Sequence, residues 1–231
     1  MTSDEEVLVQ CRDLARTYGS GHSAIVAVHG VTCDVRAREC IAIVGPSGSG
    51  KSTLLHLMAS LDDPTAGTVT WPALGERAAL RPRQVGVVFQ SPSLLAPLDI
   101  EENVALPLVI GGTDPALAAD AAHRALSRVG LDDVMNALPE ELSGGQAQRA
   151  AVARVMAVRP RLILADEPTG QLDHVAGALV IDALVATAAD AGAALVVSTH
   201  DAAVADRLTW QWHMVDGKII GARREEASCS A

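Results

Sequence analysis

The sequence predicts an α/β fold with a mostly parallel sheet, an N-terminal antiparallel β subdomain and an inserted α-helical lobe. Two observations predict it. Short apolar, β-branched runs alternate with helical segments, an order typical of a parallel sheet. A stretch rich in Ala and Leu, residues 91–160, then interrupts this alternation without any β-branched run. The 231 residues, 49% of them hydrophobic, suffice for one large domain with such an insertion.

The first strands are expected before the insertion. Residues 7–14 and 24–35 have the alternating pattern of strands, and residues 40–44 form a short apolar run typical of a buried strand. Two more strands are expected at residues 68–71 and 85–89, the second because it is apolar and β-branched. These segments predict the β subdomain and the first strands of the main sheet.

The inserted lobe carries clear helix boundaries. Asp114-Pro115 predicts the start of a helix over residues 116–129, because proline is favoured in a first turn, and Gly130 predicts its stop. Ser143 predicts the start of a second helix that runs to about residue 157, with a proline shortly beyond it. The lobe is therefore expected to be helical.

After the lobe the alternation resumes. We expect a buried strand at residues 162–165, a helix at 172–189 and a strand at 194–198. Asp216-Gly217 is a strong two-residue hairpin signal between the strands expected at 210–215 and 218–220. The expected organisation is one domain over residues 1–231, with a core (7–90 and 161–220), a helical lobe (91–160) and a polar tail (221–231).

Charge argues against nucleic acid as a partner. The net charge is −10 and the pI is about 5.1, whereas non-specific nucleic-acid binding needs clustered Lys and Arg. The basic stretch of Arg77, Arg81 and Arg83 is interrupted by Pro82 and apolar residues, which favours a solvated turn.

Cysteine spacing and hydropathy narrow the class of protein further. Cys11, Cys33, Cys40 and Cys229 form no C-x-x-C pair, so they indicate reduced thiols of a cytosolic protein and give no support to a zinc site. The acidic residues 1–6 do not resemble a signal peptide. The most apolar window, 176–197, is broken by two aspartates, so we expect no membrane-spanning segment.

The most informative segment is a glycine-rich loop at residues 45–53. It fits the pattern G-x-x-x-x-G-K-[ST], follows an apolar strand and precedes a predicted helix, a context that makes a chance Gly/Ser-rich loop improbable. Lys51 is expected to reach the outer phosphates of a nucleoside triphosphate, and Ser52 to coordinate Mg²⁺. The expected nucleotide-binding residues here are Gly45, Pro46, Ser47, Gly48, Ser49, Gly50, Lys51, Ser52 and Thr53.

Two carboxylates end the apolar strand at 162–165. Asp166 is suited to hold Mg²⁺, and Glu167 is then placed to orient the attacking water or accept its proton. The alternative is an acidic pair that caps a helix before Pro168. The phosphate loop in the same chain favours the functional interpretation.

A second anion site is predicted at the start of the helix after Leu142. Ser143, Gly144, Gly145 and Gln146 place free N–H groups and the positive end of the helix dipole together. An ordinary N-cap followed by flexible glycines is the alternative. A second phosphate-facing helix start in one nucleotide-binding chain suggests a site completed by another subunit.

These motifs, in this order, resemble the ATP-binding subunits of ABC transporters, with a P-loop NTPase core. The resemblance covers residues from about Val7 to Ile220, and the Leu142–Gln146 signature is close to diagnostic. In that family two subunits pack head to tail, and each ATP lies between one phosphate loop and the partner's signature helix. The resemblance therefore implies a homodimer when ATP is bound.

The resemblance also implies roles for single residues. Glu167 matches the family's catalytic glutamate, and His200 matches the switch histidine that contacts the γ-phosphate. Gln90 matches the residue that senses Mg²⁺ and water, Tyr18 the aromatic that stacks on adenine, and Asp173 the loop acid at the dimer interface. A lone tyrosine or histidine is more often structural, so the other histidines are given no role.

Departures from the family pattern are few. Arg38 stands where relatives usually have glycine, and it is expected to strain that turn modestly. Gln171 stands where relatives often have Asn or Ser. Neither position touches the chemistry, so an active ATP hydrolase is expected.

The implied protein uses ATP and Mg²⁺ and drives a separate membrane permease, as a peripheral subunit at the cytoplasmic face of the inner membrane. Residues 93–108 and 166–173 resemble the lipoprotein-release and macrolide-export group, which favours export or release of lipoproteins, peptides or drugs. Two alternatives stay open. One is the ATPase of a non-transporting cell-division complex, and the other is a soluble ABC ATPase that acts on nucleic acid or ribosomes.

Overall fold

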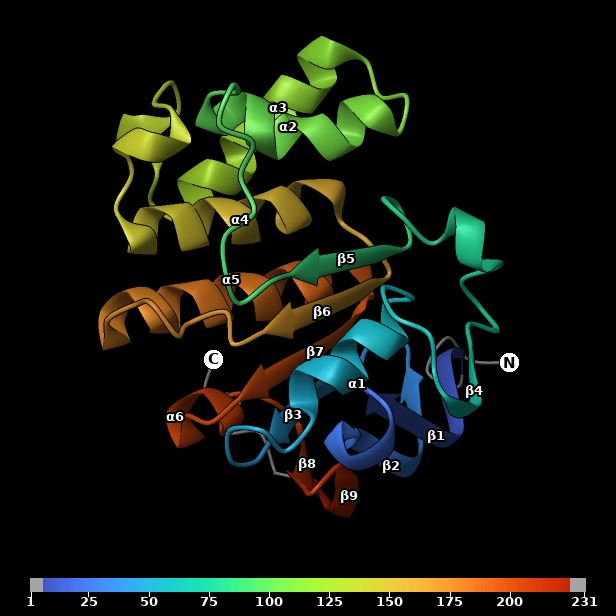
Figure 1. Ribbon diagram of the computed structural model, residues 1–231. Helices are drawn as coiled ribbons and strands as arrows, with labels where there is room; N and C mark the ends of the chain where they lie inside the picture. The colour runs from blue at the N-terminus through green and yellow to red at the C-terminus, as the bar shows by residue number, and fades with distance from the viewer. Residues whose placement is uncertain (1–5, 225–231) are drawn as a thin grey trace.

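The computed structural model describes residues 6–224 and contains two β-sheets with helices around them (Figure 1). The strands are β1 (Val7–Tyr18), β2 (Ile25–Arg36), β3 (Cys40–Val44), β4 (Ala66–Thr70), β5 (Val85–Val88), β6 (Leu162–Asp166), β7 (Ala194–Thr199), β8 (Trp210–Val215) and β9 (Lys218–Arg224). The helices are α1 (Lys51–Met58), α2 (Ile100–Ile110), α3 (Pro115–Arg128), α4 (Gly144–Val158), α5 (His174–Ala191) and α6 (Ala202–Ala205). Short 3-10 turns lie at Gly21–Ser23, Arg77–Ala79, Asp132–Val134 and Pro139–Glu141.

The topology confirms the predicted α/β class. The larger sheet has the order β5-β6-β7-β3-β8-β9, and only the β8–β9 pair is antiparallel. The smaller sheet, β2-β1-β4, is antiparallel throughout. Because neighbouring parallel strands end at the same edge of a sheet, β3, β6 and β7 deliver the segments that follow them to one place. Those segments are the phosphate loop, Glu167 and His200.

Helix starts follow the predicted capping residues. The Asp114 side chain accepts hydrogen bonds from the N–H groups of Ala116 and Leu117 at the start of α3. Ser143 caps α4 as expected. Helix α5 begins two residues later than expected, because Asp173 is its N-cap and accepts from the Ala176 N–H at 2.8 Å.

The sequence analysis predicted a helical lobe over residues 91–160 but gave no bounds for helix α2. It begins with a capping box, in which Asp99 and Glu102 each accept a backbone N–H of the other, at 2.8 and 3.0 Å. Pro107 lies inside the helix, a position where proline removes a backbone hydrogen bond and disguises helical periodicity.

Two strands are longer than predicted. β1 continues to Tyr18, and β9 continues to Arg224, where it pairs with Trp210 of β8. The first four residues of the expected polar tail are therefore part of the sheet. The Arg224 guanidinium lies 5.6 Å from the centre of the Trp210 ring, a contact that supports this last pair. Residues 225–231 lie outside the described residues.

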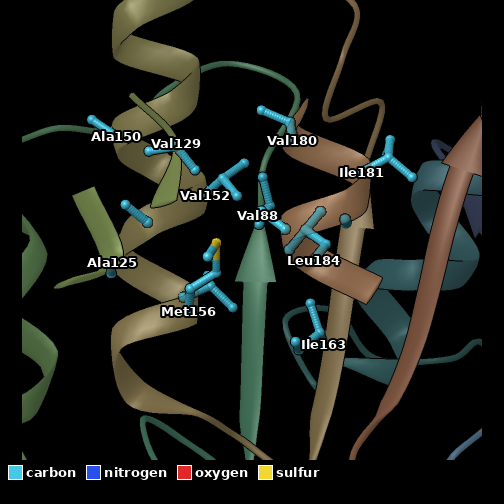
Figure 2. Packing of buried hydrophobic residues seen from close by; sticks show 14 of the residues in the cluster. Val88, Ala125, Val129, Ala150, Val152, Met156, Ile163, Val180, Ile181 and Leu184 are labelled. Atoms are coloured by element: carbon cyan, nitrogen blue, oxygen red, sulfur yellow. The ribbon is translucent and has the colours of Figure 1, made fainter. Parts of the chain in front are cut away.

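Two buried clusters form the core, one on each side of the larger sheet. One cluster joins the helices α2–α5 to β5, β6 and β7, and the other joins α1 and the smaller sheet to the same strands. Figure 2 shows the first, where Val152 and Met156 of α4 face Val180 and Leu184 of α5 around Val88. The helices of residues 100–158 therefore share a continuous core with the sheet.

Among residues 6–224, only α5 has the length and apolar composition that a membrane-crossing helix needs. Its buried residues include Val180, Ile181 and Leu184, which pack within the first cluster. This packing is that of a core helix in a folded domain.

We expect Leu184→Ala to lower the free energy of unfolding by about 2–5 kcal/mol, because the side chain is fully buried and truncation leaves a cavity. Leu179 lies on the same helix and is 41% exposed, so Leu179→Ala is the matched control and should change stability by less than about 1 kcal/mol. Urea unfolding midpoints would measure both. Equal losses in the two variants would contradict this account of the core.

Candidate functional site

The phosphate loop connects β3 to α1 in a backbone form that requires glycine. Gly50, the N-cap of α1, has φ 99°, and a Cβ there would lie 2.0 Å from the Ala27 carbonyl oxygen. Gly48 has φ 79° and open space where a side chain would be. The loop therefore packs tightly against β2 on one side and leaves its backbone accessible at Gly48.

Lys51 lies within the curve of this loop. Its side chain is largely buried, and Nζ donates to the carbonyl oxygens of Gly45 and Pro46 at 2.9 and 3.0 Å. Ser49 is also buried, and its hydroxyl has no protein partner. A held ammonium beside the open backbone of the loop fits the oxygens of a bound polyphosphate, whereas the buried Ser49 hydroxyl does not line the cavity.

Asp166 is connected to the loop by two serine hydroxyls. Ser52 Oγ donates to Asp166 Oδ1 at 2.9 Å, and Ser198 Oγ donates to the same oxygen at 2.5 Å. Asp166 is 4% exposed at the end of β6. Although 114 residues separate Ser52 from Asp166 in sequence, the fold places the two predicted metal ligands in contact.

Glu167 is held at the mouth of the site by its backbone. Its N–H lies 3.1 Å from both the carbonyl oxygen and the hydroxyl of Ser198, and its φ is 44°, which is unusual for a residue with a side chain. Its carboxylate Oε2 lies 2.9 Å from His200 Nδ1. Two of the three residues predicted to act in catalysis, Glu167 and His200, are therefore in direct contact, and the third, Gln90, lines the same cavity.

A cavity of about 600 Å³ joins these groups. It brings together three segments that are distant in sequence, namely the phosphate loop, Gln90 at the end of β5, and the Glu167–His200 pair. Its lining residues are Ala27, Ser47, Gly48, Gly50, Lys51, Ser52, Thr53, Gln90, Glu167, Gly170 and His200.

The signature residues lie outside this cavity. Ser143 and Gln146 form a capping box at the start of α4, with bonds of 3.2 and 2.9 Å. A Cβ on Gly144 would meet the Gln171 side-chain oxygen at 3.0 Å, and one on Gly145 would meet Leu172 at 3.3 Å. Within one described chain, the signature therefore contacts the segment before α5 and not the phosphate loop.

Asp173 and Tyr18 also lie outside the phosphate-loop cavity. Asp173 lines a neighbouring cavity of about 310 Å³, which shares Glu167 and His200 with the first. Tyr18 lies at the end of β1 and is 40% exposed. The predicted phosphate-loop, metal-binding and catalytic residues therefore lie together around one cavity. The signature, Asp173 and Tyr18 each lie outside it.

Ser198 is the functional residue that the sequence analysis missed. It bonds Asp166 and the backbone of Glu167 at once, so it fixes the relative positions of both carboxylates. The only sequence signal is its place two residues before His200, at the end of a buried strand. Ala27, whose carbonyl oxygen leaves no room for a side chain at Gly50, belongs to no motif that the sequence analysis could have used.

The donor set fits a hard cation. Within the described residues no group of three or more His, Cys, Asp or Glu side chains converges on one point. Ser52 and Asp166 supply oxygen ligands, with Gln90 on the same cavity. Mg²⁺ is usually held by one or two protein oxygens together with substrate phosphates and water, so this sparse set suits it.

The comparisons with known proteins agree on one family. A family profile described as "ABC transporter" matches residues 28–170. The chain is 40% identical over 222 residues to the "Lipoprotein-releasing system ATP-binding protein LolD" of Hydrogenovibrio crunogenus, which covers 93% of this chain and 96% of that protein.

Solved structures give the same result. The structure titled "Dimeric structure of a post-hydrolysis state of the ATP-binding cassette MJ0796 bound to ADP and Pi" is 34% identical to this chain, with a TM-score of 0.86 over 94% of this chain and 98% of that one. CbiO1 from Clostridium perfringens, titled as part of the ABC transporter complex cbiONQ, is 25% identical with a TM-score of 0.79, over 95% of this chain and 89% of that one.

Proposed function

The chain is an ATP-hydrolysing member of the ABC transporter family, and on this premise we propose that it powers a separate membrane permease. It binds MgATP, closes head to tail on a second copy of itself, and opens after hydrolysis. We place it as a peripheral subunit at the cytoplasmic face of the inner membrane. One domain holds the ATP-binding core (7–90 and 161–220) and the helical lobe (91–160).

The contact between Glu167 and His200 at the phosphate-loop cavity carries the proposal. The Glu167 carboxylate accepts a proton from water while the water oxygen attacks the γ-phosphorus. The bond between that phosphorus and the bridging oxygen breaks, and ADP and phosphate are the products. His200 Nδ1 orients the carboxylate. Catalysis is then mainly positioning and stabilisation of charge.

The remaining groups position the substrate. Lys51 and the loop amides bind the β- and γ-phosphates, and Ser198 fixes Asp166 relative to Glu167. Ser52, Asp166 and Gln90 would hold Mg²⁺, which would neutralise charge on the phosphate oxygens.

The isolated position of the signature supports a dimer. Ser143–Gln146 presents helix N–H groups away from the phosphate loop of its own chain, so an ATP bound to that loop would reach a signature only from a second subunit. The MJ0796 cassette with ADP and phosphate is a dimer. Binding of ATP therefore favours closure, and loss of the γ-phosphate favours opening.

The surface of the lobe suits a permease segment. A cavity of about 490 Å³ lies between α2 and the start of α3, beside Leu98, Leu106 and Val109, and acidic groups at Glu101 and Glu102 border it. Exposed apolar side chains continue this surface at Ile110 and Leu117. The cavity includes residues from Leu98 onward and not Gln90. We propose that an amphipathic helix of the permease covers it and extends into the groove between Gln90 and residues 91–108.

The similarity to a lipoprotein-releasing system protein favours an export or release system. An ATPase of a cell-division complex that transports nothing remains the second candidate, because it uses the same catalytic site. The acidic net charge opposes the third candidate, a soluble ATPase of nucleic acid or ribosomes.

Co-purification tests the proposed partner. A tagged Glu167→Gln variant, isolated from native membranes with MgATP, should retain one permease identified by mass spectrometry. Transport by that permease in vesicles would then separate the transporter from the cell-division complex. Recovery of ribosomal or other soluble proteins alone would contradict the proposal.

A further inference from the structure

We propose that Arg16 and Asp62 form a clamp that holds the Tyr18 ring in place for the base of the nucleotide. The inference rests on the proposed ATP-binding function and on the adenine-stacking role that the family resemblance implies for Tyr18, and what it adds is the two residues that hold the ring. Arg16 and Asp62 are positioning residues here, since they act on the base through Tyr18.

Three contacts define the clamp. The Tyr18 hydroxyl donates to Asp62 Oδ2 at 2.7 Å. The Arg16 guanidinium lies over the ring, 4.6 Å from its centre, and makes an ion pair with Asp62 Oδ1 at 2.8 Å. Arg16 and Tyr18 come from β1, whereas Asp62 follows α1, so the clamp closes between two elements. The ring is thus fixed at its tip and along one face.

The electrostatics of the cluster agree with this geometry. Partial desolvation would raise the pKa of Asp62, but the hydrogen bond from Tyr18, the Asp63 amide and Arg16 together lower it. Asp62 is therefore a carboxylate at neutral pH and accepts from both partners at once.

Two elements connect the clamp to the phosphate loop. Helix α1 begins at Lys51 in the loop and rises about 12 Å over its eight residues, and Asp62 follows its end. On the other side, Tyr18 pairs with Ile25 of β2, two residues before Ala27, which lines the phosphate cavity. A nucleotide anchored by its phosphates at Lys51 would carry its base toward this region.

The exposed ring surface is what a base would use. Arg16 covers one face, yet Tyr18 remains 40% exposed although two contacts, from Asp62 and Arg16, hold its side chain. The exposed part of the ring offers an apolar surface on which a base can stack. Holding the ring before the ligand arrives removes part of the ordering cost of binding.

Calorimetric titration with ATP and with inorganic tripolyphosphate, which has no base, tests the clamp. We expect Arg16→Ala to raise the Kd for ATP about two- to fivefold, the range of an exposed cation–π contact, and to leave the Kd for tripolyphosphate unchanged. Tyr18→Ala should raise the Kd for ATP at least about fivefold. Arg16→Lys should restore most of the loss, and the KM for ATP should rise in Arg16→Ala without a change in kcat.

Two comparisons separate the clamp from general stability. Arg12 lies on the same strand as Arg16 and makes a two-bond ion pair with Asp34 of β2, at 2.6 and 3.2 Å. Arg12→Ala removes this pair and should leave both Kd values unchanged. The double variant Arg16→Ala/Tyr18→Ala should bind ATP no more weakly than Tyr18→Ala alone, because Arg16 acts through the ring.

The contradicting results differ for the two proposals. Additive losses in the double variant, or an equal loss for tripolyphosphate, would overturn the clamp while ATP binding by the parent protein stands. Absence of ATP binding by the parent protein would overturn the proposed function itself.

Discussion

Replacing Glu167 with glutamine is expected to lower the rate of ATP hydrolysis at least about a hundredfold while ATP still binds. Glutamine has the same shape as glutamate but cannot accept a proton from the attacking water. The backbone of residue 167 is held by Ser198, and this anchoring does not involve the side chain that is changed. The phosphate loop and the Ser52–Asp166 contact are untouched, so affinity for the triphosphate should be kept.

The dimer provides a second readout for the same variant. Because the γ-phosphate persists, Glu167→Gln should accumulate as a closed dimer in MgATP, visible by size-exclusion chromatography, and remain so for much longer than the parent protein. Asp190→Asn is the matched control, since it makes the same carboxylate-to-amide change at an exposed position near the end of α5. Turnover by Glu167→Gln at the parent rate would show that Glu167 is not the catalytic base.

Much of this site could be predicted from sequence because its chemistry depends on short local segments. The phosphate loop, Glu167 and His200 each follow an apolar strand, and parallel strands end at one edge. Local sequence patterns therefore identified the phosphate loop, Glu167 and His200, and the strand order of the sheet brings them to one site. The 2.9 Å contact between Glu167 and His200, 33 residues apart, is a product of that topology.

What could not be predicted depends on contacts without a local pattern. In the sequence, Ser198 is an ordinary small residue on a buried strand. Only the fold shows that it bonds both Asp166 and the backbone of Glu167. Asp62 is a loop aspartate until its distance from Tyr18, 44 residues away, is known. Such side-chain contacts between separate elements have no periodicity in the sequence.

The packing of the helical lobe in the core is another feature that local sequence patterns could not predict. Its composition predicted helices, but not that α4 shares a core with α5 and the sheet, as Figure 2 shows for Val152 and Leu184. The shared core means that the signature at the start of α4 is carried on a helix packed against the catalytic sheet. Gln148 strengthens that connection, since its side-chain amide donates to the Phe89 carbonyl beside Gln90, at 3.3 Å.

The second large effect is expected for Lys51→Ala, which should weaken ATP binding about tenfold to a hundredfold, the range for the loss of a charged hydrogen-bond donor. Nζ is the cationic group within the curve of the phosphate loop, and alanine leaves only the backbone amides to meet the phosphates. The readout is the rise in melting temperature caused by MgATP, which depends on affinity and on ligand concentration. The parent protein should show a clear rise, and Lys51→Ala little or none at the same ATP concentration.

The sequence itself supplies the control for this prediction. The chain has only two lysines, and the second, Lys218, is exposed at the start of β9 and does not line the phosphate-loop cavity. Lys218→Ala should therefore keep the full ATP-dependent rise in melting temperature. Melting without nucleotide detects any loss of fold in Lys51→Ala, because the lysine also bonds Gly45 and Pro46 of its own loop. A folded Lys51→Ala protein with the parent affinity for ATP would contradict the assignment of this loop, and the site would then have to be sought around another part of the sheet edge.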